Sequence, residues 1–336
     1  MGLHTSRMRA PLIDCLQYAN WSPEIFRQMR AGGVDAVHVT VAYHETFSEM
    51  VGNLVKWNRW FELFPDLIVK GRTARDIDLA QNTNRTAIFF GLQNPGPIRA
   101  DIGLVEICHE LGIRFMQLTY NMQSLLGSGC FEETDSGLTQ FGRQVVGEMN
   151  RIGMVVDLSH AGIQTIRDII DCSGRPVALT HANPEWWHPA RRNVSDDVLR
   201  ALAGRGGMIG FSLYPHHLKD GSDCRLESFC DMVAEAASRY GSDRLGIGSD
   251  LCQDQPDSVV EWMRTGRWSK QLQFGEGSRE RPGFPHMPSW FKDNRDFGHI
   301  RAGLLKTGFS TVEVDGIMGA NWARFFAEGF EPEAGS

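Results

Sequence analysis

Two apolar runs that each end near a histidine constrain the fold of this chain more than any other feature. Residues 154–158 and 176–180 have the composition of buried β-strands, and His160 and His181 follow them closely. The segment between the runs has isoleucines at the spacing of an amphipathic helix. A strand–helix–strand unit of this kind has parallel strands. The two histidines are therefore expected at the same carboxyl edge of a sheet, where α/β proteins carry out chemistry.

The same alternation of strands and helices runs through most of the chain. Eight apolar or β-branched runs, separated by helical patterns, predict eight strands. They span residues 11–15, 35–42, 86–92, 114–119, 154–158, 176–180, 207–213 and 244–249. Eight such units are typical of an α/β fold of the (β/α)8 TIM barrel class, and we expect residues 1–336 to form one such domain.

Two regions fall outside the repeating units. The stretch of about 253–297 is rich in Trp, Arg, Pro and Gly, and we expect it to form an insertion over the barrel mouth. Residues 300–326 are expected to form two closing helices.

Composition limits the partners and the location of the protein. A net charge of −7 without a basic stripe argues against nucleic acid or an anionic membrane as the main partner. No apolar run approaches the roughly 18 residues of a membrane span, and the N-terminus lacks the apolar core of a signal peptide. The seven cysteines lack CxxC spacing, which favours reduced thiols. We therefore expect a cytoplasmic protein that acts on a small molecule.

Polar side chains follow most of the predicted strands and should gather around one barrel mouth. The set is Asp14, His44, Gln93, Tyr120, His160, His181 and Asp250. Histidines and an aspartate around one mouth suit a divalent metal that activates water, with the aspartate as a ligand or general base.

Five segments resemble the membrane (renal) dipeptidase family, whose members are metallopeptidases of the amidohydrolase superfamily. They read GLTQFGRQVVGEMNRIGMVVDLSHAG, LTHAN, RRNVSDD, LGIGSD and IMGANWAR. The resemblance covers about residues 11–326 and is most specific in order and spacing from 137 to 197. It implies an amidohydrolase-like barrel that cleaves a small dipeptide-like amide with metal-activated water. Family members are commonly dimers, so it also implies a possible homodimer.

The resemblance also implies roles for residues at the matching positions. His160 and His181 would bind zinc, Arg192 would bind a substrate carboxylate, and Asp250 would move a proton during catalysis. A bidentate guanidinium suits the role of Arg192. Tyr120 stands where the family has a substrate-binding histidine, and Asn121 beside it is a second candidate substrate contact.

The first metal motif of the family, D-G-H-x-D, is altered in this chain. Asp14 is retained, but Leu16 and Tyr18 replace the histidine and the second aspartate. Gln93 replaces the bridging glutamate, and a neutral amide bridges two divalent cations poorly. We therefore expect one zinc ion rather than two, held by the two histidines, with Gln93 and Asp14 as weaker candidate ligands.

Three functional interpretations remain open at this point. The first is a metal-dependent hydrolase for a small substrate that carries a carboxylate. The second keeps the metal but acts on a different C–N bond, as a hydrolase, lyase or isomerase in small-molecule catabolism. The third is a pseudoenzyme that binds a ligand or partner, although the joint retention of His160, His181 and Asp250 argues against it. His38 or His44, near the end of the second strand, could supply a replacement ligand.

Overall fold

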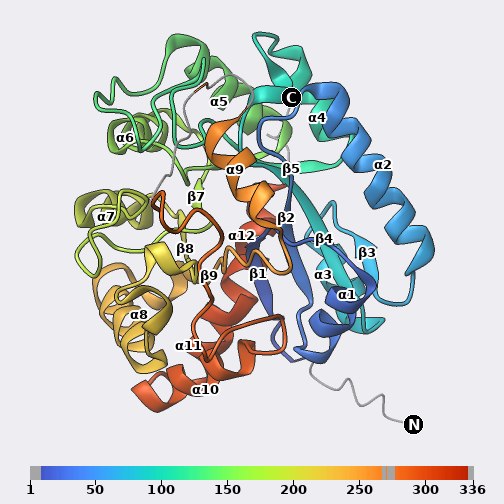
Figure 1. Cartoon of the computed structure of the whole chain (residues 1–336), viewed down its shortest axis with the longest axis vertical. Coiled ribbons are helices and arrows are strands. Elements are labelled where there is room, and N and C mark those ends of the chain that lie inside the picture. Colours follow the sequence, from blue (N-terminus) through green and yellow to red (C-terminus); the bar gives the residue numbers. More distant parts are fainter. Residues whose placement is uncertain (1–8, 267–269, 271–276, 332–336) are drawn as a thin grey trace.

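Parallel strands close into a barrel in this protein, which confirms the predicted (β/α)8 TIM barrel. The computed structural model describes residues 9–266, 270 and 277–331. Neighbouring strands pair in the order β2-β1-β9-β8-β7-β6-β5-β4, and pairing of β2 with β4 closes the ring. Helices surround the ring on its outer side (Figure 1).

The barrel strands agree with the predicted segments to within a few residues. They are β1 (Ile13–Gln17), β2 (Ala36–Ala42), β4 (Thr86–Leu92), β5 (Ile113–Gln117), β6 (Val155–Asp157), β7 (Ala178–Leu179), β8 (Met208–Phe211) and β9 (Leu245–Ile247). Every residue in these strands is buried. Because both faces of each strand are covered, the strands appear in the sequence as continuous apolar runs.

A further strand, β3 (Ile68–Lys70), lies outside the predicted set. It pairs with the first half of β4, through 86–88, while β5 pairs with the second half, through 90–92. The strand therefore fills the seam between β4 and β5 at the amino end of the barrel and does not belong to the closed ring. Three residues are too few for periodicity to reveal.

The outer helices alternate with the barrel strands, as the helical patterns in the sequence predict. They are α1 (Pro23–Ala31), α2 (Phe47–Leu63), α3 (Arg75–Asn82), α4 (Gly103–Glu110), α5 (Gln140–Ile152), α6 (Ile163–Cys172), α7 (Asp196–Gly204) and α8 (Leu226–Tyr240). The Ser22 side chain caps α1, which has a proline in its first turn, and Thr46 and Glu49 form a capping box at α2. These local signals are the reason that the sequence marks the helix starts.

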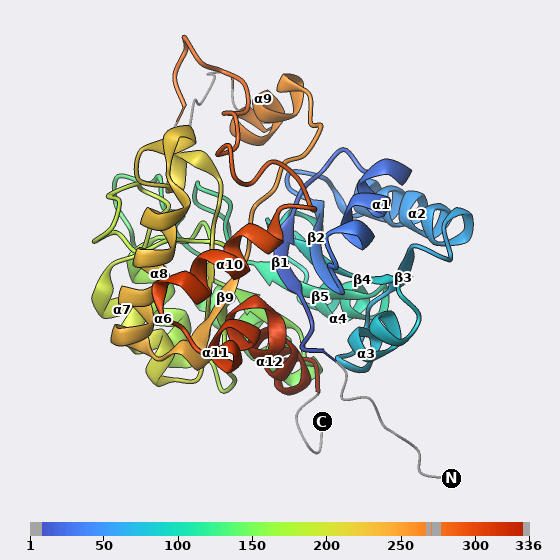
Figure 2. The same cartoon turned by 90° about the horizontal axis from the view of Figure 1, so that it is seen from below.

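The C-terminal region forms three helices where two were expected. They are α10 (Phe297–Thr307), α11 (Thr311–Asp315) and α12 (Asn321–Gly329), with a π-helical segment, Gly316–Ala320, before the last one. Trp322 donates a hydrogen bond to the Ile247 carbonyl at 3.0 Å, and the Phe326 ring packs on Phe115 at 5.3 Å. Helix α12 therefore plugs the amino end of the barrel (Figure 2).

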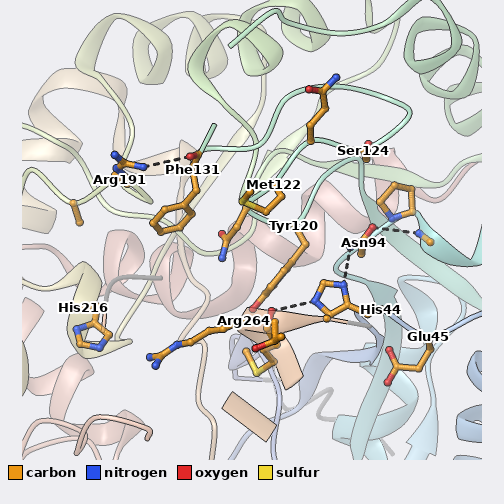
Figure 3. A pocket seen from close by; sticks show the side chains of 18 of the residues that line it. His44, Glu45, Asn94, Tyr120, Met122, Ser124, Phe131, Arg191, His216 and Arg264 are labelled. Atoms are coloured by element: carbon orange, nitrogen blue, oxygen red, sulfur yellow. Dashed lines mark hydrogen bonds between the residues drawn. The ribbon is translucent and has the colours of Figure 1, made fainter. Parts of the chain in front are cut away.

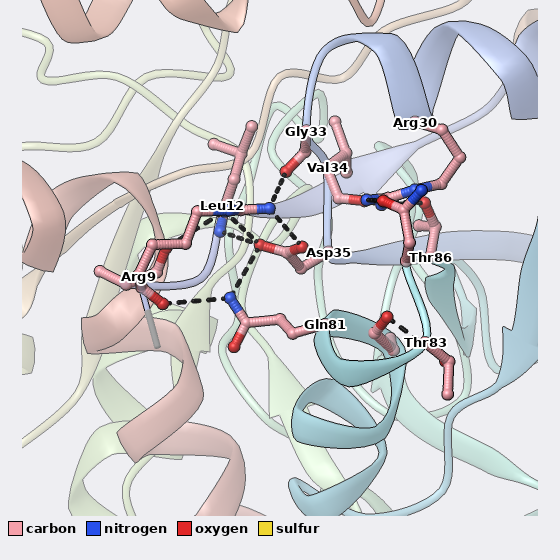
Figure 4. Close-up of polar contacts among 12 residues, drawn as sticks. Arg9, Leu12, Arg30, Gly33, Val34, Asp35, Gln81, Thr83 and Thr86 are labelled. Carbon is pink, nitrogen blue, oxygen red and sulfur yellow. Dashed lines mark hydrogen bonds and ion pairs between the residues drawn. The ribbon is translucent and has the colours of Figure 1, made fainter. Parts of the chain in front are cut away.

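A buried carboxylate organises the same amino end of the barrel (Figure 4). The Asp35 side chain has no exposed area, and both of its oxygens accept hydrogen bonds from the Arg9 guanidinium at 2.7 Å. The Leu12 N–H at 2.8 Å and the Gln81 amide at 3.2 Å donate to it as well. The charge of Asp35 is thus matched within the protein, as a buried charge requires.

The opposite end of the barrel carries a helix from the predicted insertion. This helix, α9 (Asp257–Thr265), lies beyond the carboxyl ends of the strands (Figure 2). In the part of the chain that the structure describes, no helix combines the length and the apolar character that crossing a membrane requires.

Candidate functional site

The carboxyl ends of the strands surround a cavity of about 1780 Å³. Its walls include the loops at 44–46, 94–96 and 120–126, and residues 263–266 at the end of α9 lie against it (Figure 3). A deeper recess continues from this cavity, and the two share Tyr120 among their lining residues. The site therefore has a wide outer part and a narrow inner part.

Most of the residues predicted for the site lie around the inner recess. Its lining includes Gln93, Tyr120, Asn121, His160, Arg192 and Asp250. His181 is fully buried beside them, with its Nε2 atom 3.1 Å from Nε2 of His160. Asp14 lies within the barrel below the recess, and His44 lies in the wall of the outer cavity.

The hydrogen bond of His160 determines which ring nitrogen carries its proton. Its Nδ1 atom lies 2.6 Å from Oδ1 of Asn121, and the Cys130 thiol donates to the same oxygen at 3.6 Å. An amide oxygen only accepts hydrogen bonds, so Nδ1 of His160 is the donor. Nε2 of His160 therefore presents a lone pair.

Hydrogen bonds among three side chains determine which ring nitrogen of His181 carries its proton. The Thr180 hydroxyl lies 2.6 Å from Oδ2 of Asp157 and 2.8 Å from Nδ1 of His181. The Asp157 carboxylate accepts the hydroxyl proton, so the Thr180 oxygen accepts from the imidazole N–H. Nε2 of His181 therefore also presents a lone pair, directed at Nε2 of His160.

Two lone pairs that face each other at 3.1 Å repel unless a cation lies between them. Burial, together with the nearby Arg192 charge, lowers the pKa of both His160 and His181 well below the ordinary value. Both rings are therefore neutral near pH 7, which is the form that binds metals. This donor pair fits one metal ion.

An aromatic cluster lies around the altered first metal motif. The rings of Tyr18 and Tyr43 meet edge to face at 4.5 Å, and those of Tyr43 and Tyr120 meet at 5.0 Å. Burial raises the pKa of Tyr43 and Tyr120 well above the ordinary value, so their phenols stay protonated. Leu16, two residues before Tyr18 in the chain, is fully buried. Among the residues that the structure describes, no group of three His, Cys, Asp or Glu side chains forms a metal site.

The Gln93 amide is held by its neighbours at the edge of the recess. Its Nε2 atom donates to the Thr40 hydroxyl at 2.7 Å and to the Tyr43 phenol at 3.1 Å. These contacts fix the plane of the amide, and one of them is made by a tyrosine of the aromatic cluster. The substitution at Gln93 is therefore coupled to the aromatic cluster.

Three residues of the recess adopt left-handed backbone conformations. The φ angles are 60° at Asn121, 69° at His160 and 55° at Asp250. Such angles are unfavourable for side chains with a Cβ atom and occur where the surrounding structure enforces them. All three lie at one recess, where the surrounding structure holds the side chains in place despite the unfavourable backbone conformation.

Asp14 holds the turn that carries Asp250. Its carboxylate accepts hydrogen bonds from the Ser249 N–H at 2.6 Å, from the Ser249 hydroxyl, and from the Gln17 amide at 2.8 Å. Burial raises the pKa of Asp14 to about 6. The Asp250 N–H donates to the Leu16 carbonyl at 3.1 Å, which completes the turn.

Two glycines allow the close packing around Thr180 that seats His181. A Cβ atom on Gly210 would lie 2.1 Å from the Thr180 carbonyl oxygen, and one on Gly248 would lie 1.7 Å from it. Real Cβ atoms do not approach a carbonyl oxygen so closely. Any side chain at either position would displace the strand end that bears the histidine.

The two histidines considered as replacement ligands make other contacts. The His38 ring is buried against Phe115, with centroids 4.2 Å apart, and its Nδ1 donates to the Cys15 carbonyl at 3.1 Å. His44 lies in the cavity wall, and its Nε2 donates to the Met263 carbonyl of α9 at 3.0 Å (Figure 3). His44 therefore joins the barrel to the insertion.

Sequence reasoning did not identify several residues of the site. These are Tyr43, Asp157, Thr180, Met263 and Arg264. The position of Asp157 and Thr180 on the two histidine strands is a signal that could have found them. Nothing in the sequence connects Met263 or Arg264 to the barrel mouth, because most of the groups around them there are distant in the chain; Met263 and His44 are 219 residues apart.

Comparisons with known proteins bear on this site. A dipeptidase named tcpJ from Claviceps purpurea (strain 20.1) is 28% identical over 297 residues, which cover 88% of this chain and 62% of that relative. This chain thus spans about three fifths of the length of that relative.

Solved structures match nearly the whole chain. An amidohydrolase from Pseudomonas aeruginosa is 33% identical, with a TM-score of 0.90 over 96% of this chain and 97% of that one. A Rhodobacter sphaeroides metallopeptidase, solved with a phosphinate mimic of L-Ala-D-Ala, shares the fold at 17% identity, with a TM-score of 0.77 over 96% and 99% of the chains. The family model described as membrane dipeptidase (Peptidase family M19) matches residues 20–263, well over half of the sequence, and this chain belongs to that family.

Proposed function

We propose that this protein is a metal-dependent hydrolase that cleaves a small dipeptide-like amide with one metal ion. The observation that carries the proposal is the pair of Nε2 lone pairs, from His160 and His181, that converge at 3.1 Å beside the cavity. The family to which the chain belongs and the dipeptidase name of its relative support the reaction class. A bound metal ion would act as a Lewis acid and lower the pKa of a water molecule.

The protein side chains would bind and orient the substrate. The Arg192 guanidinium is buried and donates to the His181 carbonyl at 3.0 Å, which fixes its position in the recess. Its charge would hold the substrate carboxylate. Asp250 would accept a proton at its carboxylate, and Tyr120, which keeps its O–H, would donate a hydrogen bond to the scissile carbonyl oxygen.

The remaining candidate residues would act through their neighbours. Asn121 would hold His160 in its metal-binding tautomer and, through the adjacent loop, face the substrate. Asp14 would fix the turn that carries Asp250, and the uncharged Gln93 amide would form part of the recess wall. Residues 253–297 would roof the mouth of a single barrel domain. The cytoplasmic location and the homodimer stay predictions from the sequence.

Metal content and hydrolysis together test this proposal. We expect purified protein to bind close to one equivalent of zinc by mass spectrometry and to hydrolyse L-Ala-D-Ala or another member of a dipeptide panel. The His160→Ala variant should lose both properties. Two tightly bound equivalents would contradict the single ion. Protein that stays metal-free after zinc is added would contradict the hydrolase.

A different C–N bond is the second candidate, and the aromatic cluster favours it. Tyr18, Tyr43 and Gln93 replace the polar surroundings of a second metal ion with rings and a neutral amide. That change would suit a substrate whose amide is more reactive than a peptide. This candidate would be supported over the first if zinc-loaded protein hydrolyses no dipeptide but opens a cyclic amide or cleaves an N-acyl compound.

A further inference from the structure

We propose that the substrate carries a second anionic group, which Arg264 of the roof helix α9 binds. The inference rests on the proposed function, in which Arg192 holds the first carboxylate. Arg264 lines both the outer cavity and the inner recess, so it lies where the two meet. Its guanidinium extends beneath Tyr120 toward His216 (Figure 3). A substrate bound at the recess would pass directly by this group.

The Arg264 guanidinium is held in place by a backbone carbonyl. Its Nη1 atom donates to the Pro282 carbonyl at 2.8 Å. None of the ion pairs between described residues involves Arg264. An arginine fork has several more N–H donors, and its planar geometry matches a carboxylate. A positioned cation at the wall of a substrate cavity, with no ion pair among the described residues, is suited to bind an anion.

The charges around the recess are unbalanced in the same direction. Its lining includes two guanidinium groups, of Arg192 and Arg264, and one carboxylate, of Asp250. The lining therefore carries one excess positive charge. The ammonium group of a dipeptide would add another, so a dipeptide with two carboxylates would match both. A metal ion at the histidines would increase the excess of positive charge.

The outer cavity continues this pattern although the whole chain is acidic. Arg99 and Arg191 also line it, against Glu45 and Asp220. Glu45 accepts a hydrogen bond from the Tyr43 N–H at 2.5 Å. With a net charge of −7 overall, arginines at the mouth are a local concentration. They would draw an anionic substrate toward the recess.

The substrate class that follows is a dipeptide-like amide with an acidic side chain, or another amide with two carboxylates.

The experiment compares dipeptides that differ only by glutamate or glutamine: Ala-Glu with Ala-Gln, and Glu-Ala with Gln-Ala. We expect wild-type kcat/KM to favour the glutamate peptide of at least one pair by about tenfold or more, as charged hydrogen bonds do. In Arg264→Gln that preference should fall to about one.

Two further variants make the result specific. Arg264→Lys keeps the charge without the fork and should retain part of the preference. Arg75→Gln, on the exposed surface of α3 at the other end of the barrel, should retain all of it. Melting temperatures check that each variant is folded. Equal cleavage of glutamate and glutamine peptides by the wild type, or a preference that survives in Arg264→Gln, would overturn the inference.

Failure of the proposed hydrolysis is distinguishable from failure of this inference. If no peptide is cleaved, calorimetry of the zinc-loaded protein with L-glutamate and with L-glutamine provides the readout. Tighter binding of glutamate that disappears in Arg264→Gln would support the second anion site while refuting peptide hydrolysis. Equal affinities would overturn the inference itself.

Discussion

The two ends of the barrel hold buried polar groups in opposite ways. At the amino end, the Asp35 carboxylate meets the Arg9 guanidinium and two further donors, so its charge is matched within the chain (Figure 4). At the carboxyl end, His160 and His181 direct lone pairs at each other, beside Arg192. The first arrangement is complete in the protein alone. In the second, two lone pairs face each other, and we infer that ligands bind there.

The strongest test of this contrast removes a lone pair at the carboxyl end. His181→Ala should abolish metal binding and lower hydrolysis by at least about 1000-fold, because the remaining imidazole cannot hold the ion alone. His299→Ala, on the outer helix α10, is the matched control and should leave both unchanged. Metal content that stays at the wild-type level in His181→Ala would refute the assignment.

The corresponding test at the amino end should change stability instead. Asp35→Ala leaves the Leu12 N–H and the partly exposed Arg9 guanidinium without their acceptor and should lower the free energy of unfolding by about 2–3 kcal/mol. Metal bound per folded molecule should not change. Asp243→Ala, which breaks an exposed pair with Arg244, should cost no more than about 1 kcal/mol in the same denaturant titration. Equal costs in the two variants would contradict the contrast.

A buried carboxylate without a cationic partner should make stability depend on pH. Burial raises the pKa of Asp14 from 3.8 to about 6, so the folded state holds a proton that the unfolded state releases. The favourable contribution is therefore full below pH 3.8 and is lost as pH rises through about 6. The stability of the wild type relative to Asp14→Asn should fall across that window by up to about 3 kcal/mol. A difference that does not vary with pH would contradict this.

The smallest expected effect concerns the hydroxyl that orients His181. Thr180→Val keeps the size of the side chain but removes the acceptor for the imidazole N–H. We expect zinc affinity to fall by about 10- to 100-fold, and nitrogen chemical shifts of His181 to report a mixture of tautomers. Thr180→Ser retains the hydroxyl and should bind zinc as the wild type does. If valine and serine variants bind zinc equally, the hydroxyl does not determine the tautomer.

The architecture of this protein is predictable because its strands are buried on both faces. Runs such as 86–92 are apolar throughout, and the segments between them have helical periodicity and capping residues. The strand β3 is not predicted because three residues are too few to show a periodicity. Family membership is predictable for a related reason, since the motifs around His160 and His181 are local in sequence.

The chemistry of the recess depends on contacts that the sequence does not encode locally. The metal-binding form of His181 follows from the Thr180 hydroxyl and from Asp157, which lies on another strand. The roof meets the barrel through His44 and Met263, which are 219 residues apart. Side chains that meet only after folding leave no pattern in a single sequence. The roles of the individual site residues stay predictions for the variants above.

The two glycines that abut Thr180 have a consequence for how this site can change through mutation. Gly210 and Gly248 touch neither substrate nor metal, yet a methyl group at either one would collide with the carbonyl oxygen before His181. In a library of all single substitutions, these positions should be as intolerant as the histidine itself. Substitutions that alter the specificity of this barrel can therefore be made at its rim, whereas Gly210 and Gly248 must be kept.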